Sequence, residues 1–340
     1  MIIRMNSFAS PKALEAVRRR VSCLGIALVE IADQLGTRFV LLGKYQQALE
    51  REFDGVSGID DIVATPSGHC LTHRAVRPDG TSIDVGATTI GTGTPTVIAG
   101  PCAVESIDQM RQSAEALCEL GVSIMRAGAF KPRTSPYDFQ GLGEKGLRII
   151  EQVRAETGRA MVTEATGVGC FDDVESVADI VQIGARNMQN VELLQRAGRS
   201  SRPILLKRHF SATIDELLHA AEYIMAAGNH DVILCERGFR SFTNHSRFTL
   251  DISAIPVLRS RTHLPVIVDP SHAAGARALV IPLAKAALAT GADGLIVEAH
   301  PCPDESACDA QQAVDFDDLE ALMQDLECEP AIVSTMGGTA

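Results

Sequence analysis

Eight short apolar runs alternate with helix-like segments over most of this chain, and this pattern restricts its fold more than any other feature. The runs are rich in β-branched residues and lie at 96–100, 122–128, 160–165, 179–184, 203–207, 231–236, 265–270 and 294–299. They are apolar along their whole length, as expected of parallel strands that are buried on both faces. Helical periodicity marks the segments between them. Eight strand–helix alternations over roughly 240 residues predict an α/β protein with a (β/α)₈ TIM barrel at 97–330.

The first 75 residues follow a different pattern. A strand-like run, MIIRM, is followed by helix-like segments at 11–24 and 45–53 and by β-branched runs at 26–31, 38–42 and 59–64. The resulting order, βαββαβ, predicts a ferredoxin-like domain over residues 1–75. Residues 76–96 are rich in Gly, Pro and Thr, which indicates a linker that contains a short hairpin. We expect residues 331–340 to form a C-terminal tail.

Composition and charge exclude several classes of protein. The formal net charge is −12 and only 4% of residues are aromatic, with no Trp, which argues against a nucleic-acid-binding protein. No apolar run reaches the length of about 18–20 residues that a membrane span needs. Nine cysteines without CxxC spacing suggest reduced thiols. The first residues lack the order of a signal peptide, so we expect a cytoplasmic protein that binds neither nucleic acid nor membranes.

Ionisable side chains follow every one of the eight predicted strands. In a parallel barrel the carboxyl ends of the strands meet at one mouth, where catalytic groups lie. We therefore expect one site that contains Cys102, Arg126, Lys131, Arg133, Thr134, Glu164, Arg186, Lys207, Arg208, Glu236, Arg237, Asp269, His272, Glu298, His300 and Asp309.

Seven of these side chains are cations: Arg126, Lys131, Arg133, Arg186, Lys207, Arg208 and Arg237. Arg offers planar, bidentate recognition of phosphate or carboxylate, and Lys acts as a movable point charge. So many cations at one mouth would repel each other unless polyanionic ligands occupied it. The alternative is that each cation only pairs with a surface acid.

A second set, Cys102, His272, Glu298 and Asp309, combines a thiol, an imidazole and two carboxylates. Such a mixed N/O/S set suits a divalent transition metal, namely Mn²⁺, Fe²⁺, Co²⁺ or Zn²⁺. Two alternatives stay open: Cys102 could be a small buried hydrophobe, and His272 could cap the helix that follows it. Cys302 and Cys308 are close to Asp309 in the sequence, and we interpret them as bystanders.

Seven motifs resemble those of one enzyme family. They are GPCAVES, RAGAFKPRTSPYDFQGLG, QIGARNMQN, LLKR, VILCERG, PVIVDPSHAAG and GADGLIVEAHP. Together they resemble 3-deoxy-D-arabino-heptulosonate 7-phosphate synthase (3-deoxy-7-phosphoheptulonate synthase), in the short bacterial form related to 3-deoxy-D-manno-octulosonate 8-phosphate synthase. The resemblance spans about residues 85–325. The N-terminal pattern resembles, with less specificity, the regulatory domain of some members.

The resemblance implies the first step of the shikimate pathway, which leads to the aromatic amino acids. Phosphoenolpyruvate would condense with erythrose 4-phosphate and release phosphate. Arg126, Lys131, Arg186, Lys207 and Arg237 would hold phosphoenolpyruvate, Arg133 and Thr134 the tetrose phosphate, and Cys102, His272, Glu298 and Asp309 the metal, with Mn²⁺ expected first. Glu164 would position water or protons. Lys131 would donate a proton, its pKa lowered by the neighbouring arginines.

The resemblance leaves alternatives open. KPRTS favours the tetrose, because the octulosonate enzymes carry an Asn-containing loop there. His209 stands where relatives usually have glycine, and its ring could narrow the mouth or point away. The rivals are the same chemistry on arabinose 5-phosphate and a catalytically silent subunit that binds an amino acid. Residues 1–75 could bind an aromatic amino acid effector or serve only in dimerisation or packing. We expect a homo-oligomer, either a tetramer or a dimer.

Overall fold

The computed structural model describes residues 1–328, so the predicted tail at 331–340 lies outside the described residues. Contacts divide the chain into two compact units. One consists of Met1–Gly80 with Ser260–His263, and the other of Thr81–Arg259 with the chain from Leu264 onward. Each unit has its own sheet and its own hydrophobic core.

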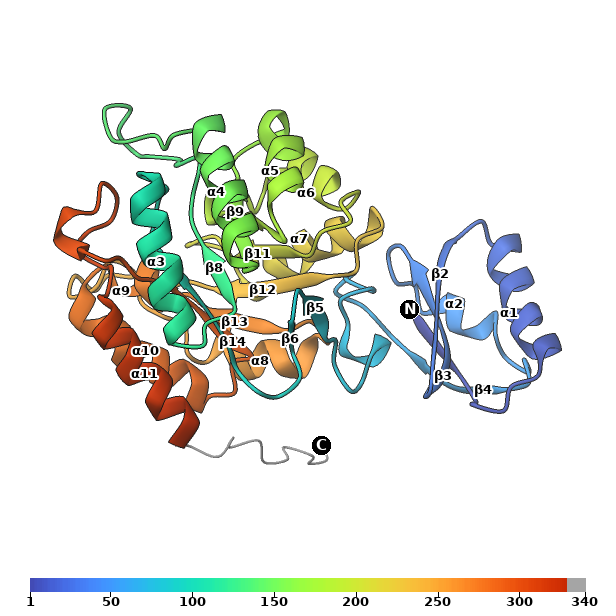
Figure 1. The fold of residues 1–340 in the computed structure, drawn as a ribbon. Coiled ribbons are helices and arrows are strands. Elements are labelled where there is room, and N and C mark those ends of the chain that lie inside the picture. The colour runs from blue at the N-terminus through green and yellow to red at the C-terminus, as the bar shows by residue number, and fades with distance from the viewer. Residues whose placement is uncertain (329–340) are drawn as a thin grey trace. The chain divides into compact units, whose positions relative to one another are not determined.

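Eight strands close a barrel in the larger unit (Figure 1). They are β7 (Thr96–Gly100), β8 (Ile124–Arg126), β9 (Ala160–Ala165), β10 (Ile180–Ile183), β11 (Ile204–Lys207), β12 (Val232–Glu236), β13 (Val266–Val268) and β14 (Gly294–Glu298). Neighbouring strands pair in parallel all the way around, in the order β10-β11-β12-β13-β14-β7-β8-β9. The predicted (β/α)₈ TIM barrel is therefore confirmed.

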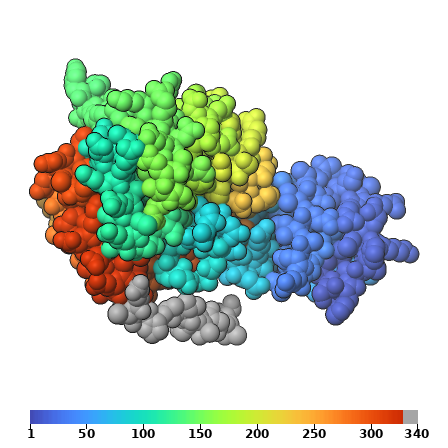
Figure 2. Space-filling model, in the orientation of Figure 1, coloured from blue at the N-terminus to red at the C-terminus, as the bar shows by residue number. Residues whose placement is uncertain are grey.

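Helices follow the strands and cover the outside of the barrel. They are α3 (Ile107–Glu119), α4 (Glu144–Thr157), α5 (Phe171–Val177), α6 (Val191–Ala197), α7 (Ile214–Ala226), α8 (Ala254–Arg261), α9 (Pro270–Ala274), α10 (Arg277–Ala289) and α11 (Phe316–Cys328). In the space-filling view, α3 and α4 form a continuous outer surface that hides the strands behind them (Figure 2). This cover explains why the strands are apolar on both faces.

The barrel interior is filled by branched aliphatic side chains from successive strands. Ile98, Ile180, Ile233 and Ile296 belong to one buried cluster. The hairpin formed by β5 (Ile83–Val85) and β6 (Thr88–Ile90) adds Ile83, Val85 and Ile90 to the same cluster. The segment predicted as a linker with a hairpin thus contributes directly to the barrel core.

The barrel closes where the last strand meets the first. Gly294 of β14 pairs with Thr96 of β7, and Glu298 pairs with Gly100. A Cβ atom on Gly294 would lie 2.3 Å from the Thr96 carbonyl oxygen, so only glycine permits this approach. Gly100 has a φ of +144°, and a Cβ there would lie 2.4 Å from the carbonyl oxygen of Arg126. Both glycines therefore allow the strand ends to come close together.

The smaller unit contains an antiparallel sheet with the strand order β2-β3-β1-β4, which fits the predicted ferredoxin-like fold. Its elements are β1 (Ile2–Met5), α1 (Pro11–Cys23), β2 (Ala27–Asp33), β3 (Gly36–Leu42), α2 (Ala48–Arg51) and β4 (Ile59–Val63), followed by the 3₁₀ turn Arg74–Val76. Val17 and Val21 of α1 pack on Ile3 and Phe39 of the sheet. The helix predicted at 45–53 is only four residues long, and no side chain caps its N-terminus at Gln47.

Candidate active site

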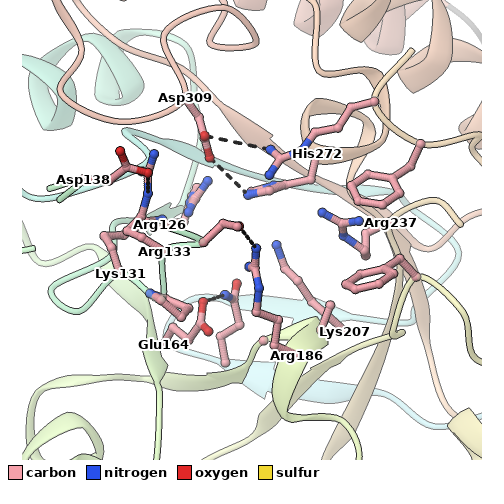
Figure 3. A pocket seen from close by; sticks show the side chains of 18 residues that line it. Arg126, Lys131, Arg133, Asp138, Glu164, Arg186, Lys207, Arg237, His272 and Asp309 are labelled. Carbon is pink, nitrogen blue, oxygen red and sulfur yellow. Dashed lines mark hydrogen bonds and ion pairs between the residues drawn. The ribbon is translucent and has the colours of Figure 1, made fainter. Parts of the chain in front are cut away.

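A cavity of about 250 Å³ opens at the carboxyl ends of the barrel strands (Figure 3). The predicted site residues on its wall are Arg126, Lys131, Arg133, Thr134, Glu164, Arg186, Lys207, Arg237, His272 and Asp309. Cys102 and Glu298 are buried beside them, Cys102 Sγ lying 3.6 Å from Asp309 Oδ2 and Glu298 Oε1 lying 3.4 Å from His272 Nε2. The structure thus brings together the residues to which the resemblance assigned substrate, metal or catalytic roles.

Arg237 is the cation whose charge is least compensated. Its side chain is buried beneath the ring of Phe248, 4.3 Å from the ring centroid, and its Nη1 has no hydrogen-bond partner among the described residues. Burial lowers the pKa of its guanidinium, against the opposing charge of Asp269. A buried guanidinium that lines a cavity and has an unsatisfied donor is suited to bind an anion.

The other cations have mixed surroundings. Arg126 Nη1 donates to Glu298 Oε1 at 2.7 Å, and Arg186 Nη2 donates to the Thr134 hydroxyl at 3.3 Å. Arg133 is held by Asp138 at 3.5 Å. These contacts position the guanidinium groups around the cavity and leave further N–H groups for a ligand.

Arg208 was predicted among the cations of the mouth but does not line the cavity. It is buried, and its Nη1 lies 2.8 Å from Glu236 and 3.0 Å from Asp251. Arg208 is thus held in ion pairs away from the cavity, but Glu236 is itself buried and is not the surface acid of the alternative. The physical reason is that Glu236, at the end of the neighbouring strand, and Asp251 hold the guanidinium.

Two groups of three potential metal ligands meet at Asp309. His272, Glu298 and Asp309 form one group, and Cys102, Cys308 and Asp309 form the other; within each group the ligand atoms lie within 4.8 Å of one another. Asp309 has a φ of +55°, and among the described residues it is the only non-glycine residue with a positive φ. A nitrogen, two carboxylates and two sulfurs, largely shielded from solvent, fit a divalent transition metal.

Cys308 was interpreted as a bystander, yet it belongs to one of the two groups of potential metal ligands. Its Sγ lies 3.1 Å from Cys102 Sγ, and it is 2% exposed. Cys302, the other cysteine near Asp309, is exposed and takes no part in either group of ligands. Residue spacing could not separate the two cysteines, because the loop conformation decides which of them turns inward.

His272 does not cap the following helix, which was the alternative for this residue. Asp269 is the cap of α9, and its Oδ1 accepts the backbone N–H of His272 at 2.9 Å. His272 Nδ1 lies 2.8 Å from Asp269 Oδ2, at an angle that falls short of a hydrogen bond. Burial lowers the pKa of His272, although Asp269 and Glu298 oppose the effect. The imidazole is therefore neutral at pH 7, the form that binds metals.

Asp269 connects the two halves of the site. Lys207 Nζ donates to the same Oδ2 atom that contacts His272. Although burial alone would raise it, the pKa of Asp269 lies well below its usual range because His272 and Lys207 stabilise the anion. A carboxylate behind a histidine fixes the ring orientation of a metal ligand. The sequence placed Asp269 at a strand end but did not predict this linking position.

Lys131 departs from expectation in its protonation. Its Nζ donates to the carbonyl oxygen of Cys102 at 3.2 Å. Burial acts to lower its pKa, but the nearby sulfurs of Cys102 and Cys308 and the carboxylate of Glu298 together raise it above the usual range. The net direction is opposite to the predicted lowering: Arg126 acts to lower this pKa as expected, but the groups that raise it outweigh Arg126 and burial.

Glu164 and Gln182 form a polar pair on adjacent strands. Gln182 Nε2 donates to Glu164 Oε2 at 2.8 Å, and the two residues face each other in the register of β9 and β10. A Cβ on Gly184 would lie 2.1 Å from Glu164 Oε1, so this glycine makes room for the carboxylate. Glu164 is thereby fixed on the cavity wall near Lys131 (Figure 3).

Arg247, Phe210 and Phe248 also line the cavity, and the sequence did not predict them. Arg247 Nη1 lies 3.8 Å from Asp309 Oδ1. The rings of Phe210 and Phe248 stack 5.5 Å apart. Arg247 and Phe248 belong to a long loop after β12, too far from the strand end for strand-end reasoning to find them.

His209 does not line the cavity, whereas its neighbour Phe210 does. The ring of His209 lies 4.0 Å from that of Phe210, and its Nδ1 is 2.9 Å from the Ser211 hydroxyl. Of the two placements considered for this ring, the structure favours the one that points away from the mouth.

Comparison with known proteins agrees with this geometry. The model of the DAHP synthetase I family matches residues 75–330. The chain belongs to this family. Phospho-2-dehydro-3-deoxyheptonate aldolase of Thermotoga maritima is 47% identical over 287 residues, which cover 84% of this chain and 85% of that protein. The family membership makes this chain an enzyme of the aldol-type condensation.

Two solved structures share this fold, and a further relative carries the name of a related enzyme. The crystal structure of the Thermotoga maritima DAHP synthase has a TM-score of 0.76 and 42% identity, with 96% of each chain covered. A truncated form from the same organism has a TM-score of 0.71, covering 76% of this chain and 95% of the other. The 2-dehydro-3-deoxyphosphooctonate aldolase of Magnetococcus marinus is 32% identical, covering 68% of this chain and 86% of the relative.

Within residues 1–328, no helix is both long and apolar enough to span a bilayer.

We predict that Asp269→Asn weakens the binding of a divalent metal about 10–100-fold, because the amide cannot hold His272 by its charge. The measurement is competition between the protein and a chromophoric chelator. Asp173→Asn, at an exposed position on α5, is the matched control and leaves the affinity unchanged. Equal affinity of Asp269→Asn and the wild type, with an unchanged melting temperature, would contradict the positioning role.

Proposed function

We propose that this enzyme condenses phosphoenolpyruvate with erythrose 4-phosphate, giving 3-deoxy-D-arabino-heptulosonate 7-phosphate and inorganic phosphate. The observation that carries the proposal is a single cavity in which the unpartnered Arg237 guanidinium lies near a cluster of N, O and S ligands. Two phosphorylated substrates need such cations, and an aldehyde needs an electrophilic partner. The 47% identity to the Thermotoga aldolase supports the same choice.

Phosphoenolpyruvate would be held by Arg126, Lys131, Arg186, Lys207 and Arg237. Among the cavity cations without an ion-pair partner, Arg237 is the most buried, and it suits the phosphate. Lys207 is already fixed by Asp269 and adds charge at a defined point. Arg133 and Thr134, on the loop after β8, would bind the tetrose phosphate and hydroxyls. The binding energy of these groups would orient the two substrates for reaction.

A divalent ion held by Cys102, His272, Glu298 and Asp309 would supply Lewis-acid polarisation of the aldehyde oxygen. The chain's own groups account for the rest. C3 of phosphoenolpyruvate attacks the aldehyde carbon, water adds at C2, and phosphate leaves by cleavage of the C–O bond. Lys131, protonated at neutral pH, is the proton donor to the new hydroxyl, and Glu164, oriented by Gln182, positions the water.

The test is phosphate release by purified full-length protein after removal and return of a divalent metal. We expect turnover with erythrose 4-phosphate, a loss of at least about tenfold after chelation, and recovery with Mn²⁺, Fe²⁺, Co²⁺ or Zn²⁺. A preference for arabinose 5-phosphate would instead assign the activity of the octulosonate relatives. Absence of turnover with either aldose and every metal would overturn the proposal and favour a silent amino-acid-binding subunit.

We also propose that the ferredoxin-like unit binds an aromatic amino acid that inhibits the barrel. Its support is the separate sheet and core of this unit and the coverage of the full-length Thermotoga structure, which includes it. We further expect a cytoplasmic homo-oligomer, a tetramer or a dimer.

For this unit we predict that tyrosine or phenylalanine inhibits the full chain, and that a chain beginning at Thr81 keeps its turnover but loses the inhibition. The readout is phosphate release as each amino acid is titrated. Equal sensitivity of the two chains, or insensitivity of both, would assign the unit to dimerisation or packing.

A further inference from the structure

Two buried thiols face each other at the edge of the candidate metal site. Cys102 follows β7, and Cys308 lies in the loop between β14 and α11, yet their sulfurs are 3.1 Å apart. Both side chains are almost fully shielded, with exposures of 1% and 2%. The proposed activity uses only Cys102, so Cys308 has no assigned role.

The surroundings of Cys308 are mixed: it packs with Cys102 and Ala103 against Phe139, but polar groups also contact its sulfur. Arg133 Nη1 donates a hydrogen bond to its sulfur, and the carboxylate of Asp309 belongs to the same group of potential ligands. Cys235, by comparison, lies in the aliphatic cluster of the barrel interior. A cysteine that serves only as a small hydrophobe would be expected in surroundings of the second kind.

The backbone conformation brings two consecutive side chains into one cluster. Successive side chains of an extended segment point in opposite directions, so Cys308 and Asp309 would normally diverge. The left-handed conformation of Asp309, with a φ of +55°, changes this direction. Such a conformation is uncommon for a non-glycine residue, and here it creates several contacts. Those contacts include Cys102 with Cys308 and Asp309 with Cys102 and His272.

Asp309 belongs to both groups of three ligands, so its carboxylate connects the two sulfurs with His272 and Glu298. We propose that Cys308 is a second sulfur donor of the metal centre, which then consists of Cys102, Cys308, His272, Glu298 and Asp309. The proposal rests on the metal dependence proposed above and makes the site more thiophilic. A second thiolate favours Zn²⁺, Fe²⁺ and Co²⁺ over Mn²⁺, which prefers oxygen ligands.

The experiment uses the full-length protein, reduced and stripped of metal, with free thiols counted before loading to exclude oxidation. Co²⁺ is then added to the wild type, Cys308→Ser, Cys102→Ser and Cys302→Ser. We expect Cys308→Ser to lose about half of the near-ultraviolet sulfur-to-cobalt absorption, because one of two Co–S bonds is removed. Cys302→Ser, which changes an exposed cysteine in the same loop, serves as the matched control and keeps the full band.

The same variants test the choice of metal. In competition between Zn²⁺ and Mn²⁺, we expect the affinity ratio in Cys308→Ser to shift toward Mn²⁺ by about tenfold or more. X-ray absorption at the zinc edge of the wild type counts sulfur neighbours without any substitution, and we expect two. This measurement decides the question even if Cys308→Ser does not fold.

The outcomes separate this inference from the proposed function. One sulfur neighbour in the wild type, or an unchanged cobalt band in Cys308→Ser, would overturn the role of Cys308 and leave the four-ligand site intact. Two sulfur neighbours with a reduced band would support it. If the wild type binds neither Co²⁺ nor Zn²⁺, both this inference and the proposed metal dependence fail.

Discussion

Closure of the barrel between β14 and β7 is the constraint on which the site depends. These strands are almost two hundred residues apart in the sequence, yet Glu298 pairs with Gly100. Their pairing places Cys102, just beyond the first strand, next to Glu298 and the loop that carries Asp309. Gly294 makes the pairing possible, because any side chain there would collide with the backbone of Thr96. The grouping of these potential metal ligands is therefore a consequence of a closed sheet rather than of any local motif.

Some of the charged side chains around the cavity form buried ion pairs, and others do not. Arg126 compensates Glu298, and Lys207 compensates Asp269, each pair being buried. Arg237, with an unused N–H group, remains available to an anion. A buried charge without its partner is strongly destabilising. Each member of a pair therefore holds its partner in place. The linkage from Lys207 through Asp269 to His272 means that the anion-binding side and the metal-ligand side are built as one unit.

The sequence predicted the barrel and the convergence of its strand ends because both follow from periodicity and from the geometry of parallel strands. Three features could not be predicted in this way. Cys308 is drawn into the site by one backbone torsion at Asp309, which no spacing reveals. Arg208 is removed from the cavity by Glu236 and Asp251, the second of which comes from a distant loop. The raised pKa of Lys131 depends on how many sulfurs surround it in three dimensions.

The most direct test of this account is a crystal structure with phosphoenolpyruvate and a divalent metal, the metal located by its anomalous scattering. The account predicts a peak within bonding distance of His272, Asp309 and Cys102, and the substrate phosphate against the Arg237 guanidinium. A metal bound elsewhere on the chain, or a phosphate outside this cavity, would contradict it.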